Sequence, residues 1–370
     1  MDFELSDEQK MLADAAQRYV REECTLEAHR AAAATPEGFS RDHWNQFAEM
    51  GWLALAIPED AGGLGGSPVD MAVLMEQLGE GLVVEPIVDS TVLCGTLLAK
   101  SDNAGLRAKL LEGIATGECI VTLAHIEGDG RSEYETQVGA TATRAGEGWT
   151  LSGTKQRVFH GQTADYWLVT ARMEGGVGLF AVARDATGVT VDTHRMIDGT
   201  QASDLSFNGT ALGADALVLA PGATQAALEE ALDRANLATT AAAIGSMEAV
   251  MAITAEYIKT RVQYGKPLST FQALQHRMAE MFVETDQAHS ILYRSLSIAL
   301  SGSAADLGKA VSAAKALVTQ ACQFVTAQGI QLHGGIGCTE EYVIGHHYKA
   351  MIVYEKRYGD ASFHLARSAR

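Results

Sequence analysis

The sequence has few cysteines, and their spacing fits neither a metal site nor a disulfide framework. Five cysteines are scattered over 370 residues, and no two of them form a CxxC pair. Cysteine-ligated zinc sites and disulfide-stapled domains need closely spaced or regularly repeated cysteines. A reducing compartment is the simplest setting for such a chain, and we expect the cytoplasm. The five residues are Cys24, Cys94, Cys119, Cys322 and Cys338.

The sequence also shows neither the pattern of a targeting signal nor an uninterrupted apolar run. Residues 1–17 carry charges throughout, and Gly, charged and polar residues interrupt the apolar stretches farther along. A signal peptide has a continuous apolar core, and a membrane-spanning helix needs about 20 predominantly apolar residues. We therefore expect no targeting segment and no membrane association.

Positive charge is scarce as well. Lys and Arg number 28 against 46 Asp and Glu, which gives a formal net charge of -18. Nucleic acids and anionic membrane surfaces repel a chain of this charge, so we expect neither as a partner. A small anionic ligand is still compatible with the sequence, because its binding depends on local charge.

The residue types change along the sequence from one region to the next, and this change predicts three domains. Residues 1–118 read as helical, beginning with a capping box at Ser6. Residues 119–222 hold short β-type runs punctuated by Gly, Asp and Asn, as in a small antiparallel sandwich or barrel. Residues 223–370 are rich in Ala and Leu and predict a four-helix bundle. The fold class is therefore α+β and multidomain. The helices expected in the last region span 223–262, 270–301, 303–333 and 340–368.

Two segments of the C-terminal region carry groups suited to a phosphate-bearing ligand. The first reads R-V-Q-Y-G-K-P-L-S-T-F-Q and begins at Arg261, whose guanidinium offers a planar fork of donors to a pyrophosphate. The second contains Gly334 and Gly335, which lack a Cβ and let backbone N–H groups approach a phosphate. Gln272 and Gln331 add neutral amides. Each segment alone is more often a solvated arginine or a tight turn, but the two together favour a binding site.

In sequence, the two segments closely resemble the motifs R-x-x-F-G-x-x-[hydrophobic]-x-x-F-Q and Q-x-x-G-G-x-G-x-x-x-E-Y of the acyl-CoA dehydrogenase family. Residues 59–66 are similar to the P-E-x-x-G-G-x-G turn of the same family. The resemblance implies the acyl-CoA dehydrogenase fold and FAD as the cofactor, with these groups holding the ADP half of a neighbouring subunit's flavin. It thus implies at least a dimer. The FAD contacts that it implies are Arg261, Tyr264, Phe271, Gln272, Gln331, Gly334 and Gly335.

The family desaturates an acyl-CoA thioester, and a carboxylate removes the α-proton while the β-hydrogen leaves as hydride to the flavin. Counted without gaps from the second motif, the family's catalytic glutamate falls on Tyr358, which precedes Gly359. The alternative base position, on the first bundle helix, falls on Ala235. Neither side chain is a carboxylate. Glu355 becomes a candidate base only if a local gap is admitted, and that gap would fall inside a helix expected to be continuous.

The middle region departs from the family at the flavin ring. Ile126 stands where the family has a hydroxyl, Arg157 replaces a tryptophan and Phe159 replaces a second hydroxyl. We expect His125, Arg157 and His160 to converge on this pocket and fill it. Asp233 matches an aspartate near the family's CoA site, although an exposed helix carboxylate is an equally good account.

This pattern, a kept ADP half and a lost ring half, resembles the base-less subunit of heteromeric bacterial acyl-CoA dehydrogenases that degrade sterol side chains and other lipids. The resemblance implies an oxidoreductase assembled as an α2β2 heterotetramer with a homologous catalytic subunit. It also implies an acyl-CoA substrate and an electron-transfer flavoprotein as acceptor. Two alternatives are a self-sufficient homotetramer that uses Glu355 as its base and an acyl-CoA-binding scaffold without flavin.

Overall fold

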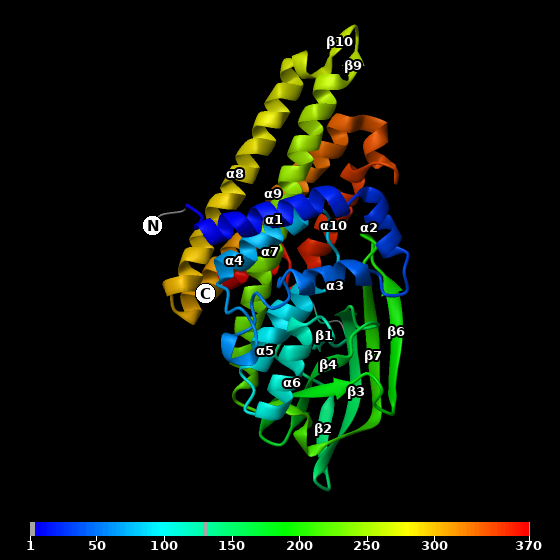
Figure 1. Cartoon of the computed structure of the whole chain (residues 1–370), viewed down its shortest axis with the longest axis vertical. Coiled ribbons are helices and arrows are strands. Elements are labelled where there is room, and N and C mark those ends of the chain that lie inside the picture. The colour runs from blue at the N-terminus through cyan, green and yellow to red at the C-terminus, as the bar shows by residue number, and fades with distance from the viewer. Residues whose placement is uncertain (1–3, 129, 131, 370) are drawn as a thin grey trace. The chain divides into compact units, whose positions relative to one another are not determined.

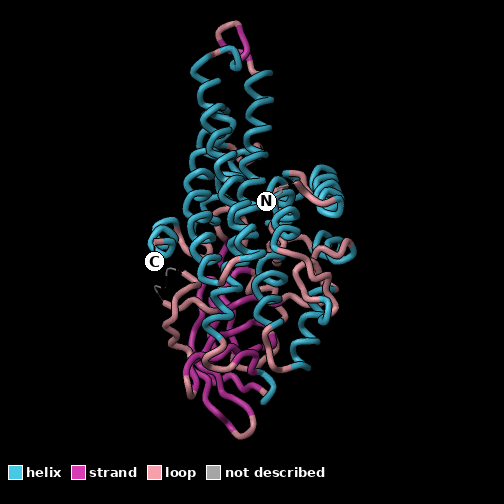
Figure 2. The backbone as a smooth tube through the Cα atoms, turned by 90° about the vertical axis from the view of Figure 1, so that its left-hand side faces the viewer, coloured by secondary structure: helices cyan, strands magenta, loops and turns pink. Residues whose placement is uncertain are grey.

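A computed structural model of the chain describes residues 4–128, 130 and 132–369. The internal contacts of the chain group into two compact units. The first unit comprises residues 1–31, 68–83 and 236–370, and the second comprises residues 32–67 and 84–235. Figures 1 and 2 show the course of the helices and strands.

The first unit is helical, apart from one small hairpin. Its hairpin joins two long helices and is drawn at their common end in Figure 1. The predicted capping box is confirmed, because Ser6 and Gln9 bond each other's backbone N–H groups at the start of the first helix. The helices found wholly or partly in this unit are α1 (Asp7–Glu23), α2 (Leu26–Ala33), α4 (Pro68–Glu80), α7 (Thr224–Thr260), α8 (Gln272–Ser301), α9 (Ala304–His333), α10 (Val343–Lys356) and α11 (Ala361–Ser368). The short elements are β9 (Val262–Gln263), β10 (Lys266–Pro267), η4 (Leu268–Thr270) and η5 (Gly334–Cys338).

Helix α9 is the centre of the bundle, and it packs against α8, α10 and α11. It begins at the N-cap Ser303, whose side chain accepts from the backbone N–H of Asp306. Small and apolar residues along it are buried. The predicted bundle of long helices is thus confirmed.

Helices α4 and α7 cross with their backbones in direct contact at two glycines. A Cβ on Gly79 would lie 1.9 Å from the carbonyl oxygen of Ala242, and a Cβ on Gly245 would lie 1.8 Å from that of Glu76. No side chain fits at those distances, so each glycine is required by the close approach. The crossing is therefore a fixed point between the two helices.

Helix α7 is more apolar than the sequence interpretation allowed. It contains an 18-residue window with a mean hydropathy of 1.4, long and apolar enough by composition to cross a membrane. However, 67% of that window is buried inside the fold, as expected for the core helix of a bundle. No other described helix meets both criteria.

The last predicted helix, 340–368, is wrong as a continuous element. Helix α10 ends at Lys356, and α11 begins only at Ala361. Between them Tyr358 has a φ of 55° and Gly359 a φ of 97°, in the left-handed region that a right-handed helix does not use. A gap in the alignment near Glu355 would therefore not interrupt a helix, contrary to expectation, because the helix already ends at Lys356.

The second unit contains a mixed sheet flanked by helices. Its path runs β6-β7-β3-β2-β4-β5-β8, and β1 pairs with β4 beside this path. The β1–β4 and β2–β4 pairings are parallel, so the prediction of a purely antiparallel sheet was wrong in this detail. The strands are β1 (Val121–Ala124), β2 (Thr141–Ala145), β3 (Gly148–Phe159), β4 (Tyr166–Met173), β5 (Gly176–Ala183), β6 (Val189–Arg195), β7 (Gln201–Leu212) and β8 (Leu217–Leu219). The helical elements are α3 (Arg41–Glu49), η1 (Glu59–Ala61), η2 (Ile87–Cys94), α5 (Gly95–Ala99), α6 (Ala104–Ala115) and η3 (Ala214–Ala216).

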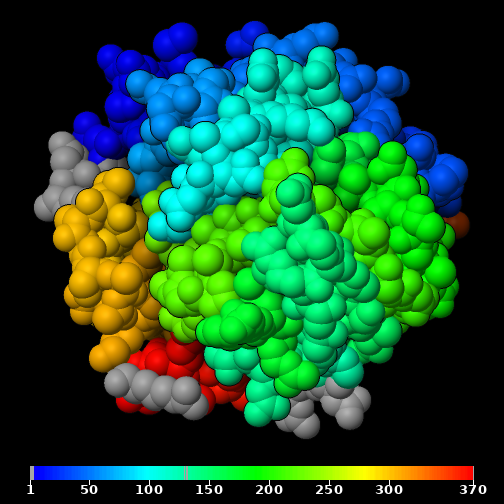
Figure 3. Space-filling view, turned by 90° about the horizontal axis from the view of Figure 1, so that it is seen from below, coloured from blue at the N-terminus to red at the C-terminus, as the bar shows by residue number. Residues whose placement is uncertain are grey.

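Aromatic side chains fill the core of this sheet. Trp149 meets Phe180 edge to face at 5.3 Å between ring centroids, and Trp167 is fully buried with its N–H donating to the Gly161 carbonyl. Helix α6 lies beside strand β4, where Lys109 donates to the Tyr166 hydroxyl at 2.7 Å, and Figure 3 shows the α6 surface in cyan next to the green strands. All four tryptophans of the chain are buried, as is usual for core residues: Trp44, Trp52, Trp149 and Trp167.

Three buried histidines predict acid sensitivity. Burial lowers the pKa of His347 to about 3 and the pKa values of His125 and His364 to about 4. An unfolded histidine has a pKa of about 6.5, so unfolding takes up protons below that pH. The free energy of unfolding should therefore be highest above pH ~6.5 and fall steadily toward pH ~4. Urea unfolding at a series of pH values measures it.

The matched variants for this experiment are His347→Gln and His194→Gln. The first removes one buried titrating group and should flatten the pH dependence by about 1.4 kcal/mol per pH unit. The second changes an exposed histidine and should leave the dependence unaltered. An unchanged slope in His347→Gln would show that this histidine is not held neutral.

Candidate functional site

The first motif folds into the β9–β10 hairpin between α7 and α8. Tyr264 and Gly265 occupy the two turn positions with φ of 52° and 80°, as a two-residue hairpin with a type I′ turn requires. The Leu268 N–H bonds the Arg261 carbonyl at 2.9 Å and closes the loop. Tyr264 is 93% exposed and meets Phe271 edge to face at 6.3 Å.

Three polar side chains of the two motifs are exposed and uncommitted. Among the described residues, none makes a hydrogen bond or ion pair with the side chains of Arg261, Gln272 or Gln331. An arginine without an internal partner keeps all its donors available to an anion. These groups are therefore free to bind a ligand without breaking an internal contact.

The second motif leaves its backbone open. Gly334 ends α9 with a φ of 67°, and a Cβ built on Gly334 or Gly335 would meet nothing within 4 Å. The two glycines are exposed at the start of η5. Open backbone of this kind admits a bulky anionic group, as phosphate-binding turns require.

A tyrosine that the sequence interpretation did not single out brings the two motifs together. Tyr257 lies one helical turn before Arg261, and its ring stacks on His333 at 4.3 Å between centroids. Its hydroxyl also donates to the His333 carbonyl at 3.2 Å. Because Gly334 follows His333 directly, the stack places the end of α7 beside the glycine turn. In the sequence, the spacing Tyr-x-x-x-Arg could have marked Tyr257, because residues four apart lie on the same face of a helix.

The two positions expected for a catalytic base are closed. Tyr358 is only 2% exposed, and its hydroxyl accepts from the Arg357 guanidinium at 2.7 Å. Ala235 is fully buried and has no ionisable group. Among the described residues, therefore, neither position offers a carboxylate.

Glu355 has its carboxylate already engaged. Oε2 accepts from Gln323 Nε2 at 2.6 Å, and Oε1 accepts from Lys356 Nζ at 3.0 Å. Both bonds hold the side chain on the surface of α9 and α10. A general base must instead reach its substrate with a free lone pair.

Asp233 is buried, so its interpretation as an exposed helix carboxylate is wrong. It is 3% exposed and accepts a hydrogen bond from the Tyr134 hydroxyl at 2.6 Å. Tyr134 thus bonds the carboxylate of Asp233, which the family resemblance places near CoA.

The middle region contains a buried polar network instead of flavin-directed hydroxyls. The Lys155 ammonium is fully buried, pairs with Glu127 at 2.6 Å and donates to Thr170 at 3.0 Å. Burial lowers the pKa of Lys155 to about 8, because the charged form loses its solvent. His125 completes the network through Thr170 and the Glu135 carbonyl. All these groups are satisfied within the sheet.

The three side chains expected to converge at the flavin ring position, those of His125, Arg157 and His160, each have partners within the second unit. His125 is bonded inside the sheet, whereas Arg157 donates to the Gly130 carbonyl and keeps its backbone N–H on Asp204. His160 instead packs against Phe39 at 6.1 Å. Ile126, at 8% exposure, presents only carbon atoms where the family has a hydroxyl. Asp129, three residues after Ile126, lies outside the described residues.

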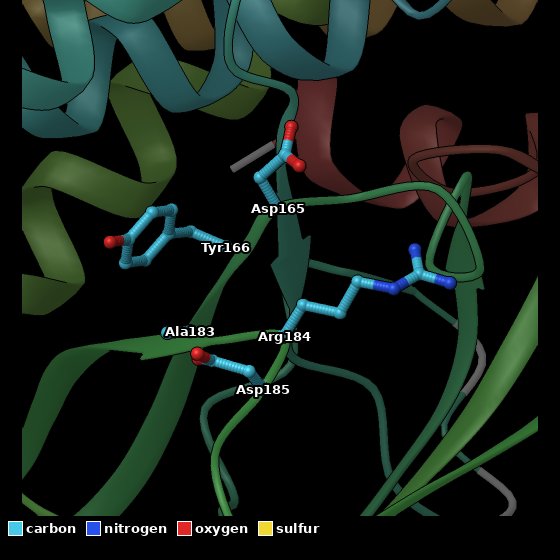
Figure 4. Close-up of a pocket in the computed structure, with 5 residues that line it drawn as sticks. All are labelled: Asp165, Tyr166, Ala183, Arg184 and Asp185. Atoms are coloured by element: carbon cyan, nitrogen blue, oxygen red, sulfur yellow. The ribbon is translucent and has the colours of Figure 1, made fainter.

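An open pocket of about 450 Å³ on the sheet does not gather reactive groups. Figure 4 shows Tyr166 and Asp185 projecting to one side and Arg184 to the other. Asp165 accepts from the Ile120 N–H at 2.8 Å, and Arg184 donates to the Gln162 carbonyl. These polar groups serve the scaffold, so the pocket is not the site.

Comparison with known proteins identifies the chain. The family descriptions "Acyl-CoA dehydrogenase, N-terminal domain", "middle domain" and "C-terminal domain" match residues 6–118, 123–210 and 222–370 in turn. Acyl-CoA dehydrogenase IpdE2 of Mycolicibacterium smegmatis is 30% identical over 93% of this chain and 92% of its own length. The chain belongs to the acyl-CoA dehydrogenase family. Acyl-CoA dehydrogenase FadE27 of Mycobacterium tuberculosis is 28% identical over 100% of this chain and 98% of its own length.

Solved structures of this family match the whole chain. A variant of the Tcur3481-Tcur3483 steroid ACAD has a TM-score of 0.88 and 31% identity, covering 98% of this chain and 97% of its own. The ChsE4-ChsE5 complex from Mycobacterium tuberculosis has a TM-score of 0.91 and 26% identity, covering 100% and 98%. The predicted fold is confirmed.

FAD is the cofactor of the acyl-CoA dehydrogenase family, and the residues of this chain fit one half of it. The uncommitted Arg261 and the open turn at Gly334 suit a pyrophosphate. The ring half does not fit, because Ile126 offers no hydrogen bond and the Arg157 head is held by Gly130.

Arg261→Ala tests the ADP half. A charge-assisted hydrogen bond contributes roughly 1.5–3 kcal/mol, so FAD affinity of the flavin-loaded assembly should fall about ten- to a hundredfold. Excess FAD should restore occupancy, and thermal unfolding of the chain should barely change. Fluorescence titration with FAD measures the affinity.

The matched control is Lys259→Ala, which removes an exposed cation two residues away that pairs with Glu256 at 2.6 Å. This change should leave FAD affinity within about twofold, since a surface ion pair contributes little. Equal losses in both variants would indicate a diffuse charge effect and contradict a specific site at Arg261.

Proposed function

We propose that this chain is the non-catalytic subunit of a heteromeric, FAD-dependent acyl-CoA dehydrogenase. In this role it clamps the ADP half of a flavin whose ring and catalytic base belong to a homologous partner subunit. The assembly is α2β2, oxidises an acyl-CoA thioester in the cytoplasm and passes electrons to an electron-transfer flavoprotein. Bound FAD would supply the hydride acceptor of the α,β-desaturation.

The observation that carries the proposal is the absence of a carboxylate at both base positions of the described chain. Tyr358 and Ala235 are buried, and the phenol of a tyrosine titrates near pH ~10, far from neutral working conditions. The adjacent Arg357 bonds the Tyr358 hydroxyl. Such a pair has no role in removing an α-proton at neutral pH.

Two further features support the same role. The groups suited to the ADP half are exposed and without internal partners among the described residues, whereas the ring-side positions are apolar or internally bonded. Asp233, near the CoA position implied by the resemblance, is bonded to Tyr134. The chain therefore offers half of a cofactor site and a closed substrate position.

The names of two structural relatives point to the assembly and the substrate class. One is a steroid ACAD named for two components, Tcur3481 and Tcur3483, and the other is the ChsE4-ChsE5 complex. By analogy we propose a bulky, steroid-type acyl-CoA as the substrate of the complex. This step rests on likeness between chains.

One observation favours the self-sufficient enzyme as a second candidate. The chain leaves the helix after Lys356, so Glu355 stands only two residues before the break at which the family's base is expected. Its bonds to Gln323 and Lys356 would have to open for it to reach a substrate. We rank this candidate below the heteromeric one for that reason.

Flavin content separates the two candidates. Purified alone, the chain should hold little FAD, because its ring-side contacts are lost. Co-expressed with a homologous subunit, the complex should contain about one flavin for each pair of chains, which visible absorbance against protein concentration measures. A yellow homo-oligomer with a full flavin per chain would rule out the heteromeric proposal.

Glu355→Gln tests the base. In the flavin-loaded complex, turnover should stay within a few-fold of normal, because a partner carboxylate removes the proton. Loss of a true general base would lower turnover by ~10²–10⁴-fold. Glu340→Gln is the control for a surface charge change. It removes a carboxylate that lies just before α10 and pairs with Lys349. A loss of that size in Glu355→Gln alone would place the base in this chain.

A further inference from the structure

Two glutamates and a histidine from three helices of the first unit meet away from the FAD half-site. Glu76 lies on α4, Glu248 on α7 and His289 on α8, and each offers one ligand atom within 4.8 Å of the other two. His289 Nε2 lies 2.8 Å from Glu248 Oε1. That contact accounts for Glu248 and His289, but it leaves the carboxylate of Glu76, the third member of the group, unaccounted for.

Glu76 is the unusual member of this group. It is partly buried, and no described residue makes a hydrogen bond with its side chain. Desolvation, opposed by His289 and reinforced by Glu248 and Glu80, raises the pKa of Glu76 to about 7. A carboxylate kept from water without a donor is costly in free energy, and a bound cation would remove that cost.

The glycine crossing described above holds the ligands in place. Gly245 lies against the carbonyl of Glu76, and Glu248 is three residues farther along α7, on the same side of that helix. Helix α8 also contacts α4, which brings His289 to the same point. The carboxylates of two helices are therefore placed together by backbone contact rather than by mobile side chains.

The surroundings of the group are poor in positive charge. Burial opposes protonation of His289, but its bond to Glu248 and the charges of Glu76 and Asp286 outweigh burial and raise its pKa. Burial and Glu248 raise the pKa of Glu80, which has Arg21 as its cationic neighbour. Several carboxylates are thus gathered around one imidazole, an arrangement that attracts a cation.

We propose that Glu76, Glu248 and His289 form a binding site for one divalent transition-metal ion, for which Zn²⁺ is the model. Two carboxylates and an imidazole form a donor set that suits zinc, whereas Mg²⁺ and Ca²⁺ prefer oxygen ligands alone. Tetrahedral bonds of about 2.1 Å need donor atoms roughly 3.4 Å apart. The side chain of Glu248 is 43% exposed and is free to rotate by the small amount required, and water completes the coordination.

The test is a calorimetric titration of the full chain with ZnCl₂ after removal of metals by chelation. The exposed Cys338 is first changed to serine, because a free thiolate would bind zinc by itself. We expect one Zn²⁺ per chain and a raised unfolding temperature, with no comparable effect from MgCl₂. Glu76→Gln and His289→Gln should each weaken binding by at least about tenfold. The control is Glu280→Gln, which changes an exposed acidic residue on α8, the helix of His289. This variant should bind Zn²⁺ as the parent does.

The unfolding temperature gives a second readout. Saturating Zn²⁺ should raise it clearly for the parent and much less for Glu76→Gln. Unfolding temperatures measured in chelator show whether each variant is folded. Absence of stoichiometric binding, equal binding by folded His289→Gln, or equal binding of Mg²⁺ would overturn the proposal.

Discussion

The stack of Tyr257 on His333 is the contact that brings the two motif segments of this chain together. It joins the end of α7 to the end of α9, although 75 residues of sequence separate the two rings. Tyr342 adds a third ring, 5.0 Å from His333. The stack therefore helps to set the position of Arg261 relative to the glycine turn.

The residues that correspond to the two halves of the family's flavin site meet different physical constraints. Those at the ADP half are exposed side chains and open backbone, which contribute little to folding. Those at the ring half lie against a sheet whose core is tightly packed, where Ile126 and Arg157 make apolar and internal contacts. The first set is therefore less constrained by stability than the second.

The parts of this structure that depend on local sequence were predictable. The long helices α7, α8 and α9 lie within a few residues of their expected bounds, because Ala- and Leu-rich stretches and the cap at Ser303 act over one or two turns. The parallel pairing of β1 with β4 was not predictable, since it depends on contacts between distant segments. The same holds for the Tyr134–Asp233 bond, and the break at Tyr358 requires a left-handed tyrosine that no propensity favours.

The Arg357–Tyr358 pair determines how a carboxylate placed at position 358 would behave as a base. A glutamate substituted for Tyr358 would stand next to a guanidinium that now bonds the phenol at 2.7 Å. That positive charge would hold the new carboxylate ionised and bound, and so reduce its basicity. A single substitution at Tyr358 would therefore not give a working general base unless the arginine changed as well.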